Sequence, residues 1–409
     1  MRFLIVSQYF EPEVGAAQVR LGAFARELIR LGHQVEVVTG MPNYPDGVIR
    51  KEYRRKLVVS EDLGGVSVHR VWLFAATGSG FQRVLNYFSF LAMSSIGFAR
   101  SKKPDFIFVE SPPPTVMFAT KVFNARWRSP IILNISDLWP DSIIALGFIE
   151  NKIAVKFLEI AENWCYRSAT LVCSVTDGIR STLENKKGVS PQRIVDLPNG
   201  VDLDLFYPNK HSVSALSEFS LGNKDVFIYA GTVGYAQKLE TAVTAMAGLS
   251  GEFPNARLLI IGGGSRWDEV KSFAKKIGST NVVFEPFVPL DRIAAILNEC
   301  HASVVTLVGA ELLKGARPSK LFPAMASGIP VLFSGSGEGA DLVTSSKSGL
   351  VSPPEDAETL AENMRTILLD RTQAKSMGQR GRRLAEERFS WEAIIGSWLE
   401  QVAQATDRR

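Results

Sequence analysis

Short apolar runs alternate with longer amphipathic stretches along the first half of the chain. FLIVS at 3–7 is followed by VRLGAFARELIRLG at 19–32 and then by VEVVT at 35–39. Apolar runs of about four to eight residues predict buried strands, and the longer stretch predicts a crossover helix. The alternation returns in DFIFVES at 105–111, in PIILNIS at 130–136, in a predicted helix from about Lys152 to Ser168 and in ATLVCSV at 169–175. Together these segments predict one doubly wound α/β domain.

A second alternation begins after VDLPNGVDLDLFYP at 195–208 and the polar stretch that follows it. Apolar runs predict strands at 227–231, 258–264, 282–287, 302–307, 330–335 and 349–353, with helices near 239–250, 267–277, 290–299, 319–327 and 356–369. We therefore expect an α/β protein with two Rossmann-like domains, over 1–208 and 209–385, and a C-terminal helix within 386–409. Ligands of such sheets bind beyond the carboxyl ends of the strands, so the expected site is a cleft between two facing sheets.

The stretch at 72–103 departs from this alternation. Its apolar run from Val84 to Ala99 is short for a transmembrane span and contains Asn86 and several serines. Basic residues flank the run, namely Arg83, Arg100, Lys102 and Lys103. Two interpretations remain open: a helix packed on the core of the first domain, or a helix partly embedded in an anionic membrane surface.

Composition narrows the function classes. The 409 residues are 46% hydrophobic, which suits two domains with separate cores. The balance of 46 basic and 42 acidic residues is too even to favour nucleic acid, although it permits anionic small ligands or an anionic membrane. The three cysteines and four histidines form no spacing typical of disulfides or zinc. The N-terminal MRFLIVSQYF predicts a first strand rather than a signal peptide, so we expect a cytoplasmic protein.

Three loops that follow predicted strands of the second domain carry glycines or cations. AGTVGYAQKLE at 230–240 contains Lys238, IIGGGSRWDEV at 261–270 contains Arg266, and GARPSK at 315–320 contains Arg317 and Lys320. Backbone N–H groups and cations in such loops bind phosphates. Each cation alone is also explained as a solvated surface charge, but three such loops in one domain favour a diphosphate. Neither glycine loop is GxGxxG, which argues against a nicotinamide cofactor.

Two stretches of the first domain offer candidates for the same ligand. Gly15, between a predicted strand and helix, either lets an anion or sugar approach the backbone or only makes a turn. Asp137 and Asp141, in NISDLWPDSIIALGF at 134–148, follow a predicted strand, where carboxylates can act as a base or hold hydroxyls. Asp141 is also a candidate helix cap, so Asp137 is the preferred functional residue. No further carboxylates or histidines cluster there, so we expect no metal.

Several longer segments resemble family 4 of the GT-B fold glycosyltransferases, in particular the bacterial branch that builds surface polysaccharides. The resemblance covers nearly the whole chain in order. It rests on six segments: FLIVSQYFEPEVGAAQVRLGAFARELIRLGHQVEVVTG, ISDLWPDS, LPNGVDLDLFYP, GTVGYAQKLE, PSKLFPAMASGIPV and RFSWE. It implies two facing Rossmann-like domains, a C-terminal helix that crosses back to the first, and retaining, metal-independent sugar transfer.

The resemblance also assigns residues. The donor diphosphate is expected at Lys238, Arg317 and Lys320 with the neighbouring Leu321, and Thr232 replaces the arginine usual in the first loop. Around the nucleobase we expect Gly262, Gly263, Gly264, Phe287 and Val288. On the first-domain side we expect Gly15 and Ala16, with Asp137 near the reacting sugar.

Two glutamates of the family pattern are missing, because Gly315 and Pro323 stand at their positions. Glu311 and Glu338 are the nearest substitutes, and Glu338 is the preferred one. Ser319 is the expected N-cap of the helix that contains Pro323, which would place the proline near the first turn, where it is tolerated.

The sequence therefore predicts a retaining hexosyl- or N-acetylaminosugar-transferase. It would use a UDP- or GDP-sugar and a polyprenyl-linked or other glycan acceptor at the inner membrane face, without cofactor or nucleic acid. A sugar-nucleotide-binding subunit without catalysis is the alternative favoured by the missing glutamates. A GT-B epimerase is disfavoured, because the acid/base carboxylates and histidine that it needs cannot be placed.

Overall fold

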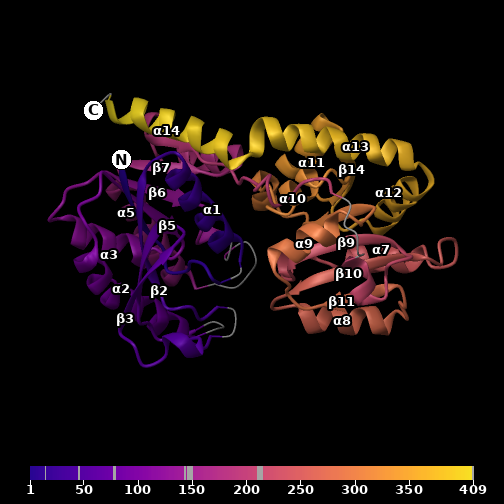
Figure 1. Ribbon diagram of the computed structural model, residues 1–409, viewed down its shortest axis with the longest axis horizontal. Helices are drawn as coiled ribbons and strands as arrows, with labels where there is room; N and C mark the ends of the chain where they lie inside the picture. The colour runs from indigo at the N-terminus through magenta and orange to yellow at the C-terminus, as the bar shows by residue number, and fades with distance from the viewer. Residues whose placement is uncertain are drawn as a thin grey trace. The chain divides into compact units, whose positions relative to one another are not determined.

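The computed structural model describes residues 1–13, 15–44, 47–76, 80–141, 144, 151–209 and 215–407. Contacts within the chain define two compact units (Figure 1). Unit 1 comprises Met1–Pro198 and Trp391–Arg409, and unit 2 comprises Asn199–Ser390. The sequence placed these boundaries near 208 and 386.

Unit 1 is built on a sheet in the order β3-β4-β2-β1-β5-β6-β7-β8, parallel except for the β3–β4 pair. Its strands are β1 (Arg2–Val6), β2 (Gln34–Gly40), β3 (Val58–Leu63), β4 (Val66–Val71), β5 (Phe106–Ser111), β6 (Ile131–Ile135), β7 (Leu171–Ser174) and β8 (Ile194–Asp196). Its described helices are α1 (Ala16–Arg30), α2 (Phe81–Arg100), α3 (Thr115–Asn124), α5 (Lys152–Ser168), α6 (Asp177–Asn185) and α14 (Trp391–Asp407). The predicted strands and helices of this half are confirmed. The β3–β4 hairpin, α3 and α6 were not predicted.

Unit 2 is built on a parallel sheet in the order β11-β10-β9-β12-β13-β14. Its strands are β9 (Asp225–Thr232), β10 (Ala256–Gly263), β11 (Val282–Glu285), β12 (Ala302–Thr306), β13 (Val331–Ser334) and β14 (Gly349–Ser352). Its helices are α7 (Glu240–Gly248), α8 (Trp267–Lys276), α9 (Leu290–Leu297), α10 (Leu321–Ala326), α11 (Glu338–Ser346), α12 (Ala357–Leu369) and α13 (Arg371–Leu384). Every predicted strand and helix of this half is confirmed, because the central strands β9, β10, β12 and β13 are largely apolar runs buried in the sheet, with β11 and β14 half-buried at its edges.

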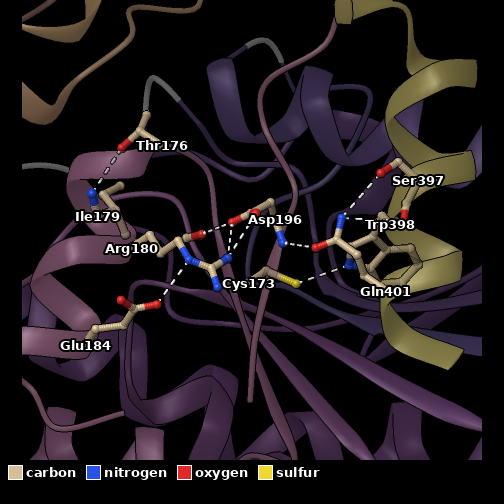
Figure 2. Close-up of polar contacts among 10 residues, drawn as sticks. Cys173, Thr176, Ile179, Arg180, Glu184, Asp196, Ser397, Trp398 and Gln401 are labelled. Carbon is tan, nitrogen blue, oxygen red and sulfur yellow. Dashed lines mark hydrogen bonds and ion pairs between the residues drawn. The ribbon is translucent and has the colours of Figure 1, made fainter. Parts of the chain in front are cut away.

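Helix α14, drawn in yellow, lies on unit 1 close to the chain's N-terminus (Figure 1). Trp398 is fully buried and packs against Phe24, with ring centroids 5.1 Å apart. Its indole Nε1 donates to Cys173 Sγ of β7 at 3.3 Å, and Gln401 Oε1 accepts from the backbone N–H of Asp196 in β8 at 2.9 Å (Figure 2). The last helix of the chain is thus part of the core of unit 1.

Helix α2 has two different faces. Asn86, Phe90, Ser94, Gly97 and Phe98 are buried, and a Cβ on Gly97 would lie 2.6 Å from Val38 Cγ1, so the helix packs tightly on β2. The outer face exposes large apolar side chains, namely Phe81, Val84, Leu85 and Phe88. The interpretation of this segment as a core helix is therefore correct for the buried face. The exposed face is compatible with the other interpretation, contact with a membrane surface. No helix in the described part of the chain is long and apolar enough to cross a membrane.

Candidate active site

The sheet of unit 2 has a topological switch point between β9 and β12. The chain runs outward from β9 through β10 to β11, then returns to β12 on the other side of β9 and continues to β14. Open α/β sheets of this kind bind ligands at the carboxyl ends of the strands next to the switch point. The loop after β9 is fixed to the end of β12, because the hydroxyl of Thr306 donates to the Gln237 carbonyl and Val308 N–H donates to Ala236 O at 2.9 Å.

Glycines allow the ends of β9 and β10 to approach closely. Gly262 has φ +155°, and a Cβ there would lie 1.9 Å from Gly231 O. Gly264 has φ +145°, and its Cβ would lie 2.5 Å from Val233 O. Side chains cannot occupy these positions without displacing backbone. The two glycine loops predicted from the sequence are therefore adjacent at one edge of the sheet.

Lys320 lies over the end of β9. Its Nζ is 5.1 Å from the ring centroid of Tyr229, and a Cβ on Gly231 would lie 2.8 Å from Lys320 Cε. Burial lowers the pKa of Lys320 to about 8, because the surrounding groups solvate the ammonium poorly. No carboxylate among the described residues lies within ion-pair distance of it. A desolvated, unpaired ammonium at a switch point is suited to bind an anion.

Lys238 lies in the loop after β9, and its backbone is left-handed with φ +43°, an uncommon conformation for a residue with a side chain. The Lys238 carbonyl accepts from Thr241 N–H at 3.1 Å, which links it to the start of α7. In the described part of the chain its ammonium also has no ion-pair partner. Thr232, at the end of β9, is exposed at the same edge.

Arg317 and Glu338 are brought together as an ion pair, with Arg317 Nε 3.1 Å from Glu338 Oε2. Both side chains are largely buried, and Glu338 is the first residue of α11. Gly337 precedes it with φ +79°, and a Cβ there would lie 2.0 Å from Lys314 O. The structure thus orients Glu338 toward Arg317, whereas the other substitute, Glu311, is 86% exposed and pairs with Lys314 at 2.6 Å. Arg266 pairs with Glu240 and Glu269.

Pro323 is the third residue of α10, and the N-cap is Lys320 rather than the expected Ser319. The prediction of Ser319 as N-cap is wrong, because α10 begins two residues after Ser319 and no side-chain hydrogen bond caps its first turn. Leu321, Phe322 and Ala324 are buried around Pro323, which is itself partly exposed. The proline therefore fits the first turn, at a position whose side chain does not enter the core.

Three further candidates lie near this edge with different environments. Phe287 is 40% exposed, and its Cε2 would lie 3.0 Å from a Cβ on Gly263, so the ring lies on the β10 loop. Val288 packs partly against the core of unit 2. Leu321 is fully buried in the same core, and its N–H donates to Pro318 O at 3.1 Å. Leu321 therefore contributes packing rather than a free amide.

The candidates in unit 1 lie at the carboxyl edge of its own sheet. Asp137 is exposed directly after β6, and Gly15 is the N-cap of α1, whose first residue is Ala16. Gly15 has an extended backbone with φ −169°, which any residue can adopt. Asp141 pairs with Lys187 at 2.9 Å, and Lys187 also binds the buried Glu162. Asp141 therefore has a structural ion pair, and Asp137 remains the candidate preferred from the sequence.

A buried charged network behind Asp137 was not predicted. Arg20 Nη2 donates to both oxygens of Glu110, at 2.6 and 2.8 Å, and Ser136 Oγ donates to the same carboxylate. Arg20 and Glu110 are 7% and 4% exposed. Burial raises the pKa of Glu110, and Arg20 opposes that shift. The sequence signal that could have revealed this network is Glu110, a charged residue near the end of the mostly apolar run DFIFVES at 105–111.

Two doubly wound units in one chain, with a glycine-lined switch point in the second, are typical of the GT-B fold. Solved structures have the same fold. Sucrose-phosphate synthase from Thermosynechococcus elongatus is 18% identical with TM-score 0.76, and the alignment covers all of both chains. Anabaena HepE in complex with UDP-glucose is 15% identical with TM-score 0.74, covering 99% of this chain and 100% of HepE.

Family comparisons agree along nearly the whole chain. A model described as "Glycosyl transferase 4-like domain" matches residues 15–200, and one described as "Glycosyl transferases group 1" matches 217–384. The putative colanic acid biosynthesis glycosyl transferase WcaI of Escherichia coli is 26% identical over 80% of this chain and 82% of WcaI. A GDP-mannose-dependent phosphatidylinositol monomannoside mannosyltransferase of Mycobacterium tuberculosis is 27% identical over 48% of this chain and 52% of that protein. The chain belongs to family 4 of the GT-B glycosyltransferases, as the resemblance implied.

Proposed function

We propose that this glycosyltransferase moves a hexose or an N-acetylaminosugar from a UDP- or GDP-sugar to a lipid-linked or surface-glycan acceptor, with retention and without a metal. The proposal of a nucleotide-sugar donor rests on Lys320, at the switch point of unit 2. Its ammonium is desolvated and has no carboxylate partner among the described residues. Relatives support the nucleotide choice, because one is named as GDP-mannose-dependent and a fold neighbour was solved with UDP-glucose. WcaI, named for colanic acid biosynthesis, supports a surface glycan.

The chemistry rests on the leaving diphosphate. The bond between the anomeric carbon and the diphosphate oxygen breaks, the acceptor's hydroxyl oxygen bonds to that carbon and its proton passes to the departing diphosphate, on which negative charge grows. Lys320 and Lys238 would stabilise this charge, with Arg317 held in place by Glu338. Part of the Lys320 population is neutral in the empty protein near pH 8, and an arriving diphosphate restores its proton.

The remaining roles follow from position. Gly262, Gly263, Gly264 and Phe287 would contact the nucleobase, because the ring of Phe287 lies on the β10 loop. Asp137 would contact the reacting sugar, since it is exposed at the carboxyl edge of the other sheet, and Gly15 and Ala16 would line that side.

We also propose that the protein is cytoplasmic and that it contacts the inner face of the cell membrane peripherally. The exposed apolar face of α2 and the exposed Arg100 and Lys102 that follow it support this contact.

Binding to a panel of sugar nucleotides tests the proposed donor. A ligand at a hundred times its Kd stabilises the folded state by about 2.7 kcal/mol, so thermal unfolding separates the donor from its analogues. Turnover with that donor and the anomeric configuration of the product, measured by NMR, then test transfer and retention. Binding of a sugar nucleotide without transfer or hydrolysis would instead favour the non-catalytic subunit, for which the observation is Gly315 and Pro323 at the glutamate positions.

A further inference from the structure

Glu285 is a partly buried carboxylate at the carboxyl edge of the sheet in unit 2. It is the last residue of β11, the edge strand that lies beside β10 (Figure 1). In the parallel register it stands opposite Ile261, so its side chain leaves the sheet on the face where Ile261 enters the core. Val283, two residues earlier in β11, packs against the same core. Glu285 therefore lies where this face of the sheet meets the carboxyl edge.

No cation neutralises Glu285 among the residues that the structure describes. Arg292, the cation nearest to it in the sequence, pairs with Glu218 instead. Arg266, which follows the neighbouring β10, pairs with Glu240 and Glu269. A carboxylate has two oxygens that only accept hydrogen bonds, and partial burial makes it costly to leave them without donors. The two oxygens of Glu285 are thus suited to a ligand that brings donors of its own.

An aromatic ring lies next to this carboxylate. Phe287 is 40% exposed, and its ring lies over Gly263, because a Cβ on that glycine would be 3.0 Å from Phe287 Cε2. Gly263 follows Ile261 by two residues in β10, so the space over it is on the same face of the sheet as Glu285. An exposed ring offers a flat surface on which a nucleobase stacks. A base on Phe287 is within reach of the carboxylate two residues away.

The spacing to Lys320 suits a nucleotide. Lys320 lies over the end of β9, and β11 is two strands away from β9 in the sheet. Neighbouring strands are about 4.8 Å apart, so the separation is roughly 10 Å. A nucleoside diphosphate holds its base at a similar distance from its phosphates, because the ribose lies between them. A nucleotide whose diphosphate meets Lys320 can therefore place its base at Phe287 and Glu285.

A carboxylate at this position discriminates among the nucleobases. Guanine has two adjacent donors, N1–H and the N2 amino group, which match the two oxygens of a carboxylate. Uracil and thymine have a single N3–H between two carbonyl oxygens, and the carboxylate repels both of those oxygens. Adenine and cytosine have an amino group beside an unprotonated ring nitrogen, so each satisfies only one oxygen of the carboxylate. Of the common bases, guanine therefore suits Glu285 best.

We propose that Glu285 selects a guanine nucleotide, so that the sugar donor is a GDP-sugar rather than a UDP-sugar. This inference rests on the proposed function and narrows the donor class that it leaves open. Glu285 accepts from N1–H and from the N2 amino group, Phe287 stacks on the base and Lys320 binds the diphosphate. Glu285 is thus a specificity-determining residue, and it takes no part in breaking the bond to the sugar.

Calorimetric titration of the unmodified chain with GDP, IDP and UDP tests the selection without any substitution. IDP carries hypoxanthine, which keeps N1–H and lacks the N2 amino group. We expect GDP to bind at least tenfold more tightly than UDP, with IDP between the two. UDP affinity equal to that of GDP would refute the selection of guanine. IDP affinity equal to that of GDP would refute the contact with the N2 amino group, and with it the paired recognition.

Glu285→Gln separates base selection from a structural role. Its amide keeps the size of the side chain but accepts one hydrogen bond and donates another. GDP affinity should therefore fall at least tenfold, whereas UDP affinity should stay the same or rise. Asp268→Asn is the matched control, because Asp268 is an exposed acid in the first turn of α8, and it should change either affinity less than twofold.

Two results would overturn the role of Glu285. Equal losses of GDP and UDP affinity in Glu285→Gln would show that the side chain acts only on the structure of the site. A loss of GDP affinity as large in Asp268→Asn would show a general effect of charge. The proposed donor site is judged separately: it fails if the unmodified chain binds neither GDP nor UDP, and it stands if UDP binds more tightly than GDP, a result that refutes only the selection of guanine.

Discussion

Lys320 carries an energetic cost in the empty protein. Its pKa is about 8 in the folded chain against an ordinary value of 10.5, so the unfolded chain holds the proton more tightly. Stability therefore rises with pH between these two values, and the cost is fully present below pH 8. We expect Lys320→Met to stabilise the empty protein at pH 7 by about 1–3 kcal/mol. Urea unfolding at pH 7 and at pH 10 measures it, and a gain as large at pH 10 as at pH 7 would contradict the assignment.

The same lysine and Lys238 should control diphosphate affinity. Lys320→Ala and Lys238→Ala should each weaken nucleoside diphosphate binding by about 1.5–3 kcal/mol, the range for a hydrogen bond to a charged group, and leave nucleoside binding unchanged. Lys314→Ala is the control, because Lys314 is exposed and paired with Glu311. Calorimetry measures all three. Parent-like affinity in both variants would show that the diphosphate binds elsewhere.

Glu338 should matter for transfer more than Glu311 does. Glu338→Ala removes the partner of the largely buried Arg317, and we expect kcat to fall at least tenfold, about 1.4 kcal/mol in the barrier. Glu311→Ala, at an exposed site, should be neutral. Pro323→Glu should tighten nucleotide binding or leave it unchanged, because the position is partly exposed. Full activity in Glu338→Ala would refute its role as the substitute carboxylate.

Helix α2 predicts a salt-sensitive membrane contact. We expect the protein to sediment with phosphatidylglycerol liposomes at low salt and to be released at about 0.5 M salt, where the Debye length is only a few ångströms. Phe88→Ser should reduce sedimentation several-fold, because it removes exposed apolar surface without disturbing the buried face. Phe157→Ser on α5, which is 70% exposed, is the comparison. A loss confined to Phe157→Ser would assign the contact to α5 instead.

Helix α14 contributes stability through one side chain above all. Trp398→Ala should lower the free energy of unfolding by about 3–5 kcal/mol, because it leaves a cavity among Phe3, Phe24 and Phe108. Trp72→Ala, at a site 36% exposed in the same unit, should cost much less. Urea unfolding followed by circular dichroism measures both. Similar losses would mean that α14 is not integral to the core.

The whole chain should work without a divalent metal. Within the described ranges, no group of three His, Cys, Asp or Glu side chains is arranged to hold a metal ion. The mechanism proposed above has Lys238, Arg317 and Lys320 supply the cations, so we expect transfer to continue within twofold when EDTA is added to the protein and its donor. Loss of activity on chelation, restored by Mg²⁺ or Mn²⁺, would refute the metal-independent mechanism.

The alternation of apolar runs and amphipathic stretches was sufficient to predict both doubly wound sheets, since buried parallel strands require continuous apolar sequence. It also placed Lys238, Lys320 and the glycine loops after the right strands, because parallel strands bring their carboxyl ends to one edge. The hairpin β3–β4 was not predicted, because β3 is half-exposed and polar, as SEDL at 60–63 shows, and β4 alternates apolar with polar residues in VSVHRV at 66–71 instead of forming an apolar run.

Only the tertiary structure determines which side chains pair when they are far apart in the sequence. The sequence does not specify that Arg317 meets Glu338, that Arg20 meets Glu110 across two elements, or that Arg83 lies beside Tyr9. It suggested a cap at Ser319, although the turn places Lys320 there and turns its ammonium toward Tyr229. Periodicity is a local property of the chain, so the sequence determined which residues enter each sheet and which loops leave it. The environment of a charge depends on what folding brings around it, and therefore only the tertiary structure decided which cations remain available to a ligand.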